Sequence, residues 1–202
     1  RSKTTTSRRT ISKKNNNIDT KVFALGGLNE IGKNMYCIEH DNELFIIDAG
    51  VKFAEEGLPG IDYVIPDYSY LKKNEKKIRG LMITHGHEDH IGGIPFLLQV
   101  VKIPFIYATP LASAMIKRKL DEKRLTNVTK IIQINDEYQI KSKYFNIGFF
   151  KTNHSIPESM GIIINSPNGR IVETGDFKFD LSPVGDVADY QKMSFLDRKS
   201  VV

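Results

Sequence analysis

Short apolar runs separated by turn-forming residues fill the first fifty positions that follow a polar N-terminus. The runs over 21–27, 34–40 and 43–50 are bounded by Gly-rich or Asp-Asn sequences. This pattern predicts three β-strands. The Gly26–Gly32 loop matches neither a P-loop nor a dinucleotide-binding fingerprint, so we interpret it as a connection between strands.

The middle of the chain changes to helical spacing. We expect a short helix within 68–78, a buried strand over 79–85 and a helix over 89–101. The apolar face of this last helix consists of Ile91, Ile94, Leu97, Leu98 and Val101.

A second amphipathic helix follows a predicted strand at 103–109. Thr109 and Pro110 form an N-cap and first-turn pair, and the helical pattern continues to about Leu125. The side chains expected to face inward are Ala112, Met115, Ile116 and Leu120.

From residue 128 onward the pattern is that of β-strands again. Pro167-Asn168-Gly169 is a strong hairpin signal. The chain is therefore β-rich, then β-α-β-α, then β-rich, which predicts a mixed α/β (α+β) fold with helices packed on sheets. The predicted strands of this last part are 129–134, 137–141, 144–155, 160–166 and 170–176.

Composition narrows the class of protein. A chain of 202 residues with 40% apolar content suits one domain with a substantial core. No apolar run approaches the roughly 20 residues that span a bilayer, and no apolar segment follows the basic N-terminus as in a secretory signal. Cys37 is the single cysteine, so no disulfide forms within the chain. We therefore expect a cytoplasmic protein without a membrane partner, with Cys37 as a buried, inert thiol.

The net charge of +5 is unevenly distributed. Residues 1–17 contain six Lys or Arg and no acidic residue, so residues 18–202 carry a formal charge of −1. We interpret 1–17 as a basic disordered tail. If it has a function, it would attract nucleic acid without sequence preference.

A cluster of ionisable residues directly follows the predicted strand at 79–85. His85, His87, Asp89 and His90 lie within six residues, and packing alone gives no reason for them. In an extended segment, His85 and His87 point the same way. Asp89 and His90 follow where the chain turns into the helix. The segment thus offers two nitrogens to one point and a carboxylate with a nitrogen to another, a donor set that suits zinc.

Three other predicted strand ends carry residues that can approach a metal. These are Asp48, His154 and Asp176. A lone aspartate at a strand end is usually a turn residue, but beside the histidine cluster we expect His154 and Asp176 to be ligands. Asp48 is expected to lie behind the ligands and orient an imidazole. His40 is interpreted as a surface residue and is not assigned to the site.

The order of these residues resembles the signature of the metallo-β-lactamase superfamily. The sequences LGGLNEIGKNMYCIE, ITHGHEDHIGGIPFLL, HSIPES and ETGDFKFDLSPVGD are similar to its β-CASP nuclease branch, and the resemblance extends over about 20–192. It implies an αββα sandwich with the active site at the sheet edge. It also implies a cytoplasmic enzyme that degrades and matures RNA by 5′→3′ exonucleolytic and endonucleolytic cleavage, with a preference for a 5′-monophosphate.

By position, the resemblance implies six ligands for two zinc ions. They are His85, His87 and His154 at the first ion, Asp89 and His90 at the second, and Asp176 bridging both. We expect His85, Asp89 and Asp176 to carry catalysis. Mn²⁺ is an alternative to Zn²⁺ at such nitrogen and oxygen ligands. Members of this branch are expected to form homodimers or homotetramers.

The sequence departs from the branch in its last part. The branch has an inserted second domain and a late histidine ligand, whereas no histidine follows His154 here. We therefore expect 18–196 to be the N-terminal half of the sandwich, without the β-CASP domain, and to fold poorly with weak or no activity. Residues 197–202, DRKSVV, match the translation of a sequencing adapter, and we expect them to be non-native.

Two other interpretations stay open. The first is a hydrolase of the same fold that acts on lactones or thioesters. The histidine cluster is the sole feature of the sequence that supports it. The second is a non-catalytic RNA-binding module that uses the basic tail. For such a module, deletion of 1–17 would abolish RNA binding and substitution of His85 would change nothing.

Overall fold

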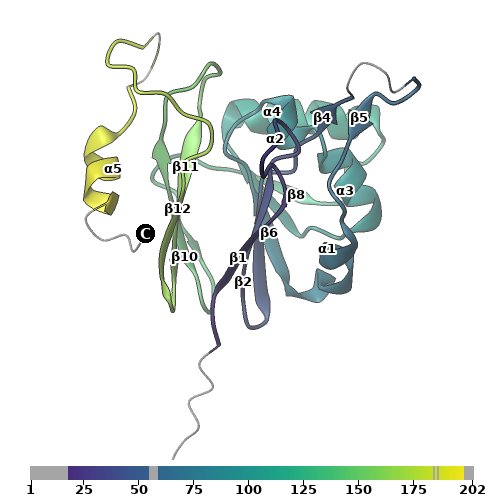
Figure 1. Ribbon diagram of the computed structural model, residues 1–202, viewed down its shortest axis with the longest axis horizontal. Helices are drawn as coiled ribbons and strands as arrows, with labels where there is room; N and C mark the ends of the chain where they lie inside the picture. Colours follow the sequence, from purple (N-terminus) through teal and green to yellow (C-terminus); the bar gives the residue numbers. More distant parts are fainter. Residues whose placement is uncertain (1–17, 55–58, 184, 186, 198–202) are drawn as a thin grey trace, which may run out of the picture.

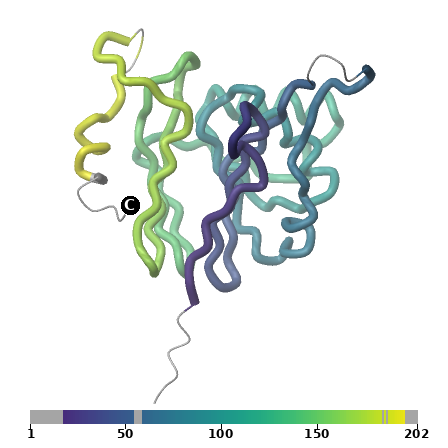
Figure 2. The backbone as a smooth tube through the Cα atoms, in the orientation of Figure 1, coloured from purple at the N-terminus to yellow at the C-terminus, as the bar shows by residue number. Residues whose placement is uncertain are grey.

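Two β-sheets face each other, and helices cover their outer faces (Figures 1 and 2). The computed structural model describes residues 18–54, 59–183, 185 and 187–197. The larger sheet has the strand order β1-β2-β3-β6-β7-β8, and the smaller has β12-β11-β10-β9. The predicted tail 1–17 and most of the predicted non-native end, residues 198–202, lie outside the described residues.

The larger sheet is antiparallel on one side and parallel on the other. β2 pairs antiparallel with β1 and β3, whereas β3, β6, β7 and β8 run parallel. Since parallel strands end at the same edge, the segments after β3 and β6 emerge side by side. Its strands are β1 (Lys21–Gly26), β2 (Met35–His40), β3 (Glu43–Ile47), β6 (Ile78–Met82), β7 (Phe105–Ala108) and β8 (Lys130–Gln133).

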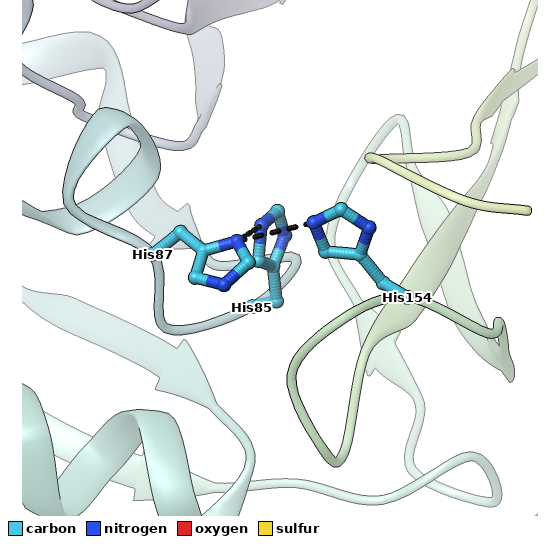
Figure 3. Close-up of side chains that lie close together, drawn as sticks. All are labelled: His85, His87 and His154. Atoms are coloured by element: carbon cyan, nitrogen blue, oxygen red, sulfur yellow. Dashed lines mark hydrogen bonds between the residues drawn. The ribbon is translucent and has the colours of Figure 1, made fainter.

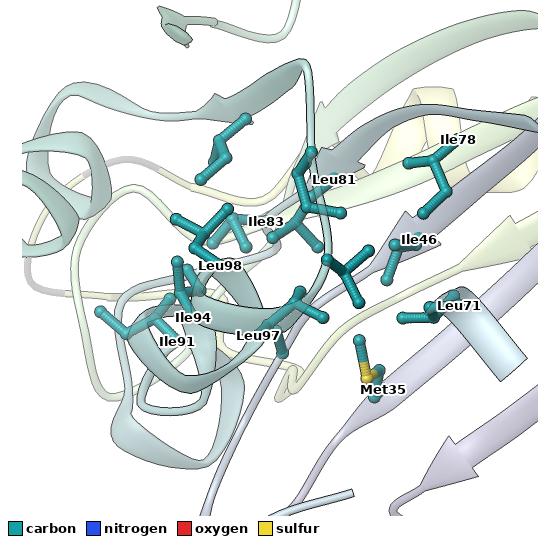
Figure 4. Packing of buried hydrophobic residues seen from close by; sticks show 14 of the residues in the cluster. Met35, Ile46, Leu71, Ile78, Leu81, Ile83, Ile91, Ile94, Leu97 and Leu98 are labelled. Atoms are coloured by element: carbon teal, nitrogen blue, oxygen red, sulfur yellow. The ribbon is translucent and has the colours of Figure 1, made fainter. Parts of the chain in front are cut away.

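Helices pack on the outer face of the larger sheet, to the right in Figure 1. The predicted apolar faces of both long helical segments are confirmed. The five residues named for 89–101 are buried, and Figure 4 shows four of them, Ile91, Ile94, Leu97 and Leu98. Ala112, Ile116 and Leu120 are also buried, with Met115 packed beside them. The helical elements are α1 (Ser69–Lys73), the 3₁₀ turn η1 (Glu75–Lys77), α2 (Glu88–Ile91), α3 (Ile94–Val100) and α4 (Pro110–Glu122).

The predicted helix over 89–101 is interrupted at Gly92 and Gly93. The Gly93 amide donates to the carbonyl oxygen of Ala49 at 2.8 Å, and a Cβ on Gly93 would lie 2.7 Å from the carbonyl oxygen of Gly50. The segment after β3 therefore passes too close for a side chain at this point. This contact divides the helix into α2 and α3 and holds α2 against the sheet edge.

The smaller sheet is entirely antiparallel. The predicted hairpin at 167–169 is confirmed, since Ser166 pairs with Gly169 across it. Three elements were not predicted: the strands β4 (Lys52–Phe53) and β5 (Tyr63–Val64), which form a short hairpin, and α5 (Tyr190–Asp197). The strands of the smaller sheet are β9 (Ile140–Lys141), β10 (Asn146–Lys151), β11 (Met160–Ser166) and β12 (Gly169–Glu173).

Apolar side chains fill the space on both faces of the larger sheet. On β3, Leu44 and Ile46 pack against the helices, whereas Phe45 and Ile47 pack toward the smaller sheet. Both faces are covered, which explains why β3 is a continuous apolar run. The outer face of the smaller sheet is less filled: its buried cluster consists of Phe150 and Ile163. These layers confirm the predicted αββα fold class, while the division at residue 196 and poor folding stay predictions.

Candidate metal centre

The predicted site residues meet at one edge shared by the two sheets. Asp48 directly follows β3, and the histidine cluster follows β6. β10 and β12 both pair antiparallel with β11, so they end at the same edge, shortly before His154 and Asp176. Figure 3 shows His85 and His87 approaching from the larger-sheet side and His154 from the smaller.

Three imidazoles form the first cluster. One ring nitrogen from each of His85, His87 and His154 lies within 4.8 Å of the other two. Nδ1 of His87 is 3.0 Å from Nε2 of His85 and 3.1 Å from Nε2 of His154 (Figure 3). A ring nitrogen carries at most one hydrogen, so Nδ1 of His87 cannot donate to both partners. Converging nitrogens of this kind suit a cation better than a hydrogen-bond network.

A second cluster combines imidazoles with carboxylates. His85, His90 and Asp176 meet the same 4.8 Å criterion. Nε2 of His90 is 3.5 Å from a carboxylate oxygen of Asp89 and 3.5 Å from one of Asp176. The same Asp176 oxygen is 3.7 Å from Nε2 of His154, so Asp176 lies between the two clusters. The structure thus brings all six predicted ligands together.

Asp48 lies behind the ligands and is fully buried. Its Oδ2 is 2.7 Å from Nδ1 of His90 and accepts a 2.8 Å hydrogen bond from the hydroxyl of Thr84. Its Oδ1 accepts from the Thr84 amide at 2.8 Å. Since the Thr84 hydroxyl donates to Asp48, its oxygen can accept from Nδ1 of His85, 3.0 Å away. This arrangement leaves Nε2 of His85 and of His90 facing the clusters.

The same surroundings shift the pKa values of the histidines. Burial, followed by repulsion from neighbouring imidazoles, lowers the pKa of His85 to about 2. Burial also disfavours the charged form of His90, but Asp48 and the two other carboxylates outweigh it and raise the pKa of His90 to about 9. Burial lowers the pKa of His154. His85 therefore keeps a lone pair at ordinary pH, whereas a cation at Nε2 of His90 would take the place of a proton.

The backbone before and after β2 and β3 holds the ligand loop in place. The Asn34 amide donates to the carbonyl oxygen of Asp89 at 3.1 Å, and its side-chain nitrogen is 3.1 Å from Nε2 of His90. The Ala49 amide donates to the carbonyl oxygen of His90 at 2.8 Å. A Cβ on Gly50 would overlap the Asp89 carbonyl oxygen, so this position requires glycine.

Sequence reasoning missed two residues of the site. Thr84 bridges Asp48 and His85, and Asn34 contacts the ligand loop. A polar residue at the end of an apolar run is the signal that could have indicated Thr84. Asn34 begins a predicted strand, and nothing in its local sequence distinguishes it from a turn residue.

The interpretation of His40 as a surface residue was wrong. Its side chain is buried, its Nδ1 is 3.0 Å from the Thr20 hydroxyl, and its ring lies 4.6 Å from that of Tyr144. The segment that covers His40 comes from the smaller-sheet half, which local sequence could not reveal. Cys37 is buried as predicted, and burial raises the pKa of its thiol to about 12.

The fold and the donor set identify the class of protein. The family model of the metallo-beta-lactamase superfamily matches residues 28–191, and the chain therefore belongs to this superfamily. The short form of human tRNase Z has a TM-score of 0.56 and 20% identity, with 80% of this chain and 71% of that chain covered. A metallo-beta-lactamase fold protein from Bacillus subtilis has a TM-score of 0.54 and 21% identity, covering 81% and 65%. These two likenesses show the fold alone.

Curated relatives narrow the similarity further. The chain is 56% identical to ribonuclease J 1 of Streptococcus pyogenes over 90% of its length, and 46% identical to ribonuclease J of Mycoplasma pneumoniae over 90%. It is 42% identical to ribonuclease J 2 of Staphylococcus saprophyticus over 95%. These alignments cover 32%, 32% and 34% of the relatives, so the chain spans about a third of their length. The relatives confirm the predicted similarity to a ribonuclease branch.

No helix within the described residues is long and apolar enough to cross a membrane.

Proposed function

We propose that the protein to which this chain belongs is a metal-dependent ribonuclease. It hydrolyses RNA phosphodiester bonds in RNA decay and in maturation of rRNA and mRNA, by 5′→3′ exonucleolytic and endonucleolytic cleavage in the cytoplasm. The observation that carries this proposal is the convergence of six nitrogen and oxygen donors at one edge of two sheets. Similarity to ribonuclease J over 90% of the chain supports the choice of substrate.

The donor set fits two zinc ions. Neutral imidazole nitrogens and carboxylate oxygens are the ligands that zinc takes in hydrolytic sites, and Mn²⁺ could replace it. When bound, such ions lower the pKa of water and withdraw charge from a phosphoryl group. The residues that would hold them are His85, His87 and His154 at the first ion, Asp89 and His90 at the second, and Asp176 at both.

The chain's own groups prepare the site for this chemistry. Asp48 and Thr84 orient the rings of His85 and His90 from behind, where no water reaches them. In contrast to the buried Asp48 and Thr84, the side chain of Asp176 is 48% exposed. A substrate phosphate therefore approaches from the side of Asp176. We assign the catalytic roles to His85, Asp89 and Asp176.

Three further properties belong to the proposal for the whole protein. They are a preference for 5′-monophosphorylated RNA, assembly into homodimers or homotetramers, and weak or no activity of residues 18–196 alone. The last is expected because the second ion would have three protein ligands, Asp89, His90 and Asp176, and Asp176 would be shared with the first ion.

Cleavage of a 5′-labelled, 5′-monophosphorylated single-stranded RNA in the presence of Zn²⁺ or Mn²⁺ tests the function. We expect the whole protein to cleave this RNA and His85→Ala to abolish cleavage while RNA binding persists. A metal-loaded protein that hydrolyses a lactone or thioester but not RNA would contradict the proposal. So would a protein whose RNA interaction disappears on deletion of 1–17 and whose behaviour is unchanged by His85→Ala.

A further inference from the structure

An aromatic segment continues directly from the candidate metal centre. Phe177 and Phe179 follow Asp176 after the end of β12, and their side chains are 39% and 77% exposed. Among the described residues, Phe179 is the most exposed phenylalanine. An isolated exposed apolar residue is ordinary, but two aromatic rings beside a hydrolytic site indicate a ligand surface.

The two rings are held in place by neighbouring elements. The Lys178 amide donates to the carbonyl oxygen of Asn153 at 2.7 Å, and Asn153 directly precedes His154. The ring of Phe179 stacks on that of Tyr190, with centroids 5.9 Å apart and an interplanar angle of 22°. The ring of Phe177 meets that of Phe179 edge-on at 5.4 Å. The segment is therefore connected to both site residues of the smaller sheet: it directly follows Asp176, and it is hydrogen-bonded to the residue before His154.

Tyr190 joins this segment to α5. Its hydroxyl accepts a 2.9 Å hydrogen bond from the Asp180 amide and donates a 2.9 Å hydrogen bond to the Asp180 carbonyl oxygen. These two bonds satisfy the polar end of the Tyr190 ring, and its face supports Phe179. The ring of Phe179 thus packs against a Tyr190 ring whose position is fixed by hydrogen bonds.

Charge does not explain what this surface would bind. The one cationic side chain between Asp176 and Asp180 is Lys178, and its Nζ is 3.0 Å from an Asp180 carboxylate oxygen. Apart from the candidate ligand Asp176, the segment 177–180 has a formal charge of zero and therefore offers a phosphate no net attraction. A ligand would have to be recognised by its planar, uncharged parts. In an RNA strand, these parts are the bases.

We propose that Phe179, backed by Tyr190 and flanked by Phe177, is a stacking platform for an unpaired base of the RNA strand next to the cleaved phosphate. The proposal rests on the proposed ribonuclease function. Stacking on an aromatic ring requires an open base face, so the platform favours single-stranded RNA. It tolerates any base, because each has a π-face.

A fluorescence experiment tests the platform directly. The 202 residues of this chain contain no tryptophan, so Phe179→Trp introduces a reporter in this part of the protein. Its emission is the difference between the spectra of the variant and of the wild-type whole protein, and a stacked base quenches it. In the whole protein without divalent metal, we expect quenching by single-stranded RNA and none by an abasic ribose-phosphate strand of equal length. The matched control is Phe105→Trp: Phe105 is 36% exposed and begins β7, at the opposite edge from the site. Its emission should stay unchanged.

Binding measurements give a second, independent readout. Phe179→Ala should weaken binding of single-stranded RNA by about 5- to 150-fold, which corresponds to about 1–3 kcal/mol for one stacked base. Binding of the abasic strand should not change, and Phe179→Tyr should restore RNA binding. Because no phosphate contact is lost, the fold-change should stay constant between roughly 50 and 200 mM salt.

The outcomes separate the platform from the proposed function. If the wild-type protein cleaves RNA but Phe179→Trp is not quenched, the platform is wrong and the function stands. If Phe179→Ala weakens binding of the abasic strand as much as binding of RNA, Phe179 maintains the shape of the segment and does not contact a base. This result also overturns the proposal. A wild-type protein that neither binds nor cleaves RNA overturns both.

Discussion

The two sheets contribute to the candidate metal centre in different ways. The larger sheet supplies His85, His90 and Asp48, whose side chains are buried and hydrogen-bonded to one another or through Thr84. It also supplies His87 and Asp89, which are partly exposed. The smaller sheet supplies His154 and Asp176, which are partly exposed and lie in the loops that follow β10 and β12. The larger-sheet side thus has a buried, hydrogen-bonded layer behind its ligands, whereas both ligands from the smaller-sheet side are partly exposed.

Packing around each sheet explains this difference. The strands β3 and β6 lie at the middle of a six-stranded sheet whose two faces are covered by apolar clusters. The outer face of the smaller sheet buries just Phe150 and Ile163 among the described residues. Groups on the larger-sheet side should therefore determine stability as well as metal binding, whereas groups on the smaller-sheet side should affect metal binding alone.

The largest expected effect is that of Asp48→Ala. The substitution removes a buried carboxylate and leaves His90 and Thr84 without their partner, which should lower the free energy of unfolding by about 3–5 kcal/mol. Urea denaturation measures this change. Asp121→Ala, at an exposed position on α4, should stay within about 0.5 kcal/mol. A loss below about 1 kcal/mol for Asp48→Ala would contradict the core-like character of this side.

Gly50→Ala should have the next largest effect. The added methyl group would overlap the Asp89 carbonyl oxygen, so the ligand loop must move, at a cost of about 3 kcal/mol. The matched control is Gly148→Ala on β10, where nothing in the described structure lies within 4 Å of the new Cβ. Denaturation and zinc titration of both variants measure the difference. Equal behaviour of the two variants would show that the ligand loop is not held by the segment after β3.

Zinc itself should stabilise the fold by joining the two sides. At a zinc concentration about 100 times the dissociation constant, the gain is about 2.7 kcal/mol, or a rise in Tm of roughly 5–11 °C for a chain of this size. Differential scanning calorimetry with and without a chelator measures it. His87→Ala should lose most of the shift, because it removes one nitrogen of the first cluster. An unchanged Tm in saturating zinc would count against the centre.

Asp176→Asn should have the smallest effect on stability. Its half-exposed side chain lies 3.5 Å from Nε2 of the buried His90, a longer contact than the 2.7 Å one of Asp48, so the free energy of unfolding should change by less than about 0.5 kcal/mol. Zinc affinity should nevertheless fall at least about tenfold. This is the smallest loss of metal affinity typical of substituting a residue that is hydrogen-bonded to a metal ligand, and a ligand itself should contribute no less. Calorimetric zinc titration measures this, with Asp121→Asn as the exposed control. A stability loss as large as that of Asp48→Ala would remove the distinction between the two sides.

The spacing of residues along the chain was sufficient to predict much of this protein. Period-2 and period-3.6 patterns identified most strands and the apolar faces of α3 and α4, because burial on one face leaves a direct trace in local sequence. The cluster from His85 to His90, together with the later His154 and Asp176, identified all six candidate ligands. Such a concentration of donors has no other physical use beside a core strand.

Other features depend on segments far apart in sequence. The break between α2 and α3 is caused by the backbone of residues 49–50, the burial of His40 by residues 144–145, and the role of Asn34 by its contact with Asp89. None of these partners is marked in the local pattern. The sequence by itself determined which donors exist and on which strand ends they lie. Only the packing of the two sheets face to face, with these strand ends at one edge, decided which donors are buried and which remain open to a substrate.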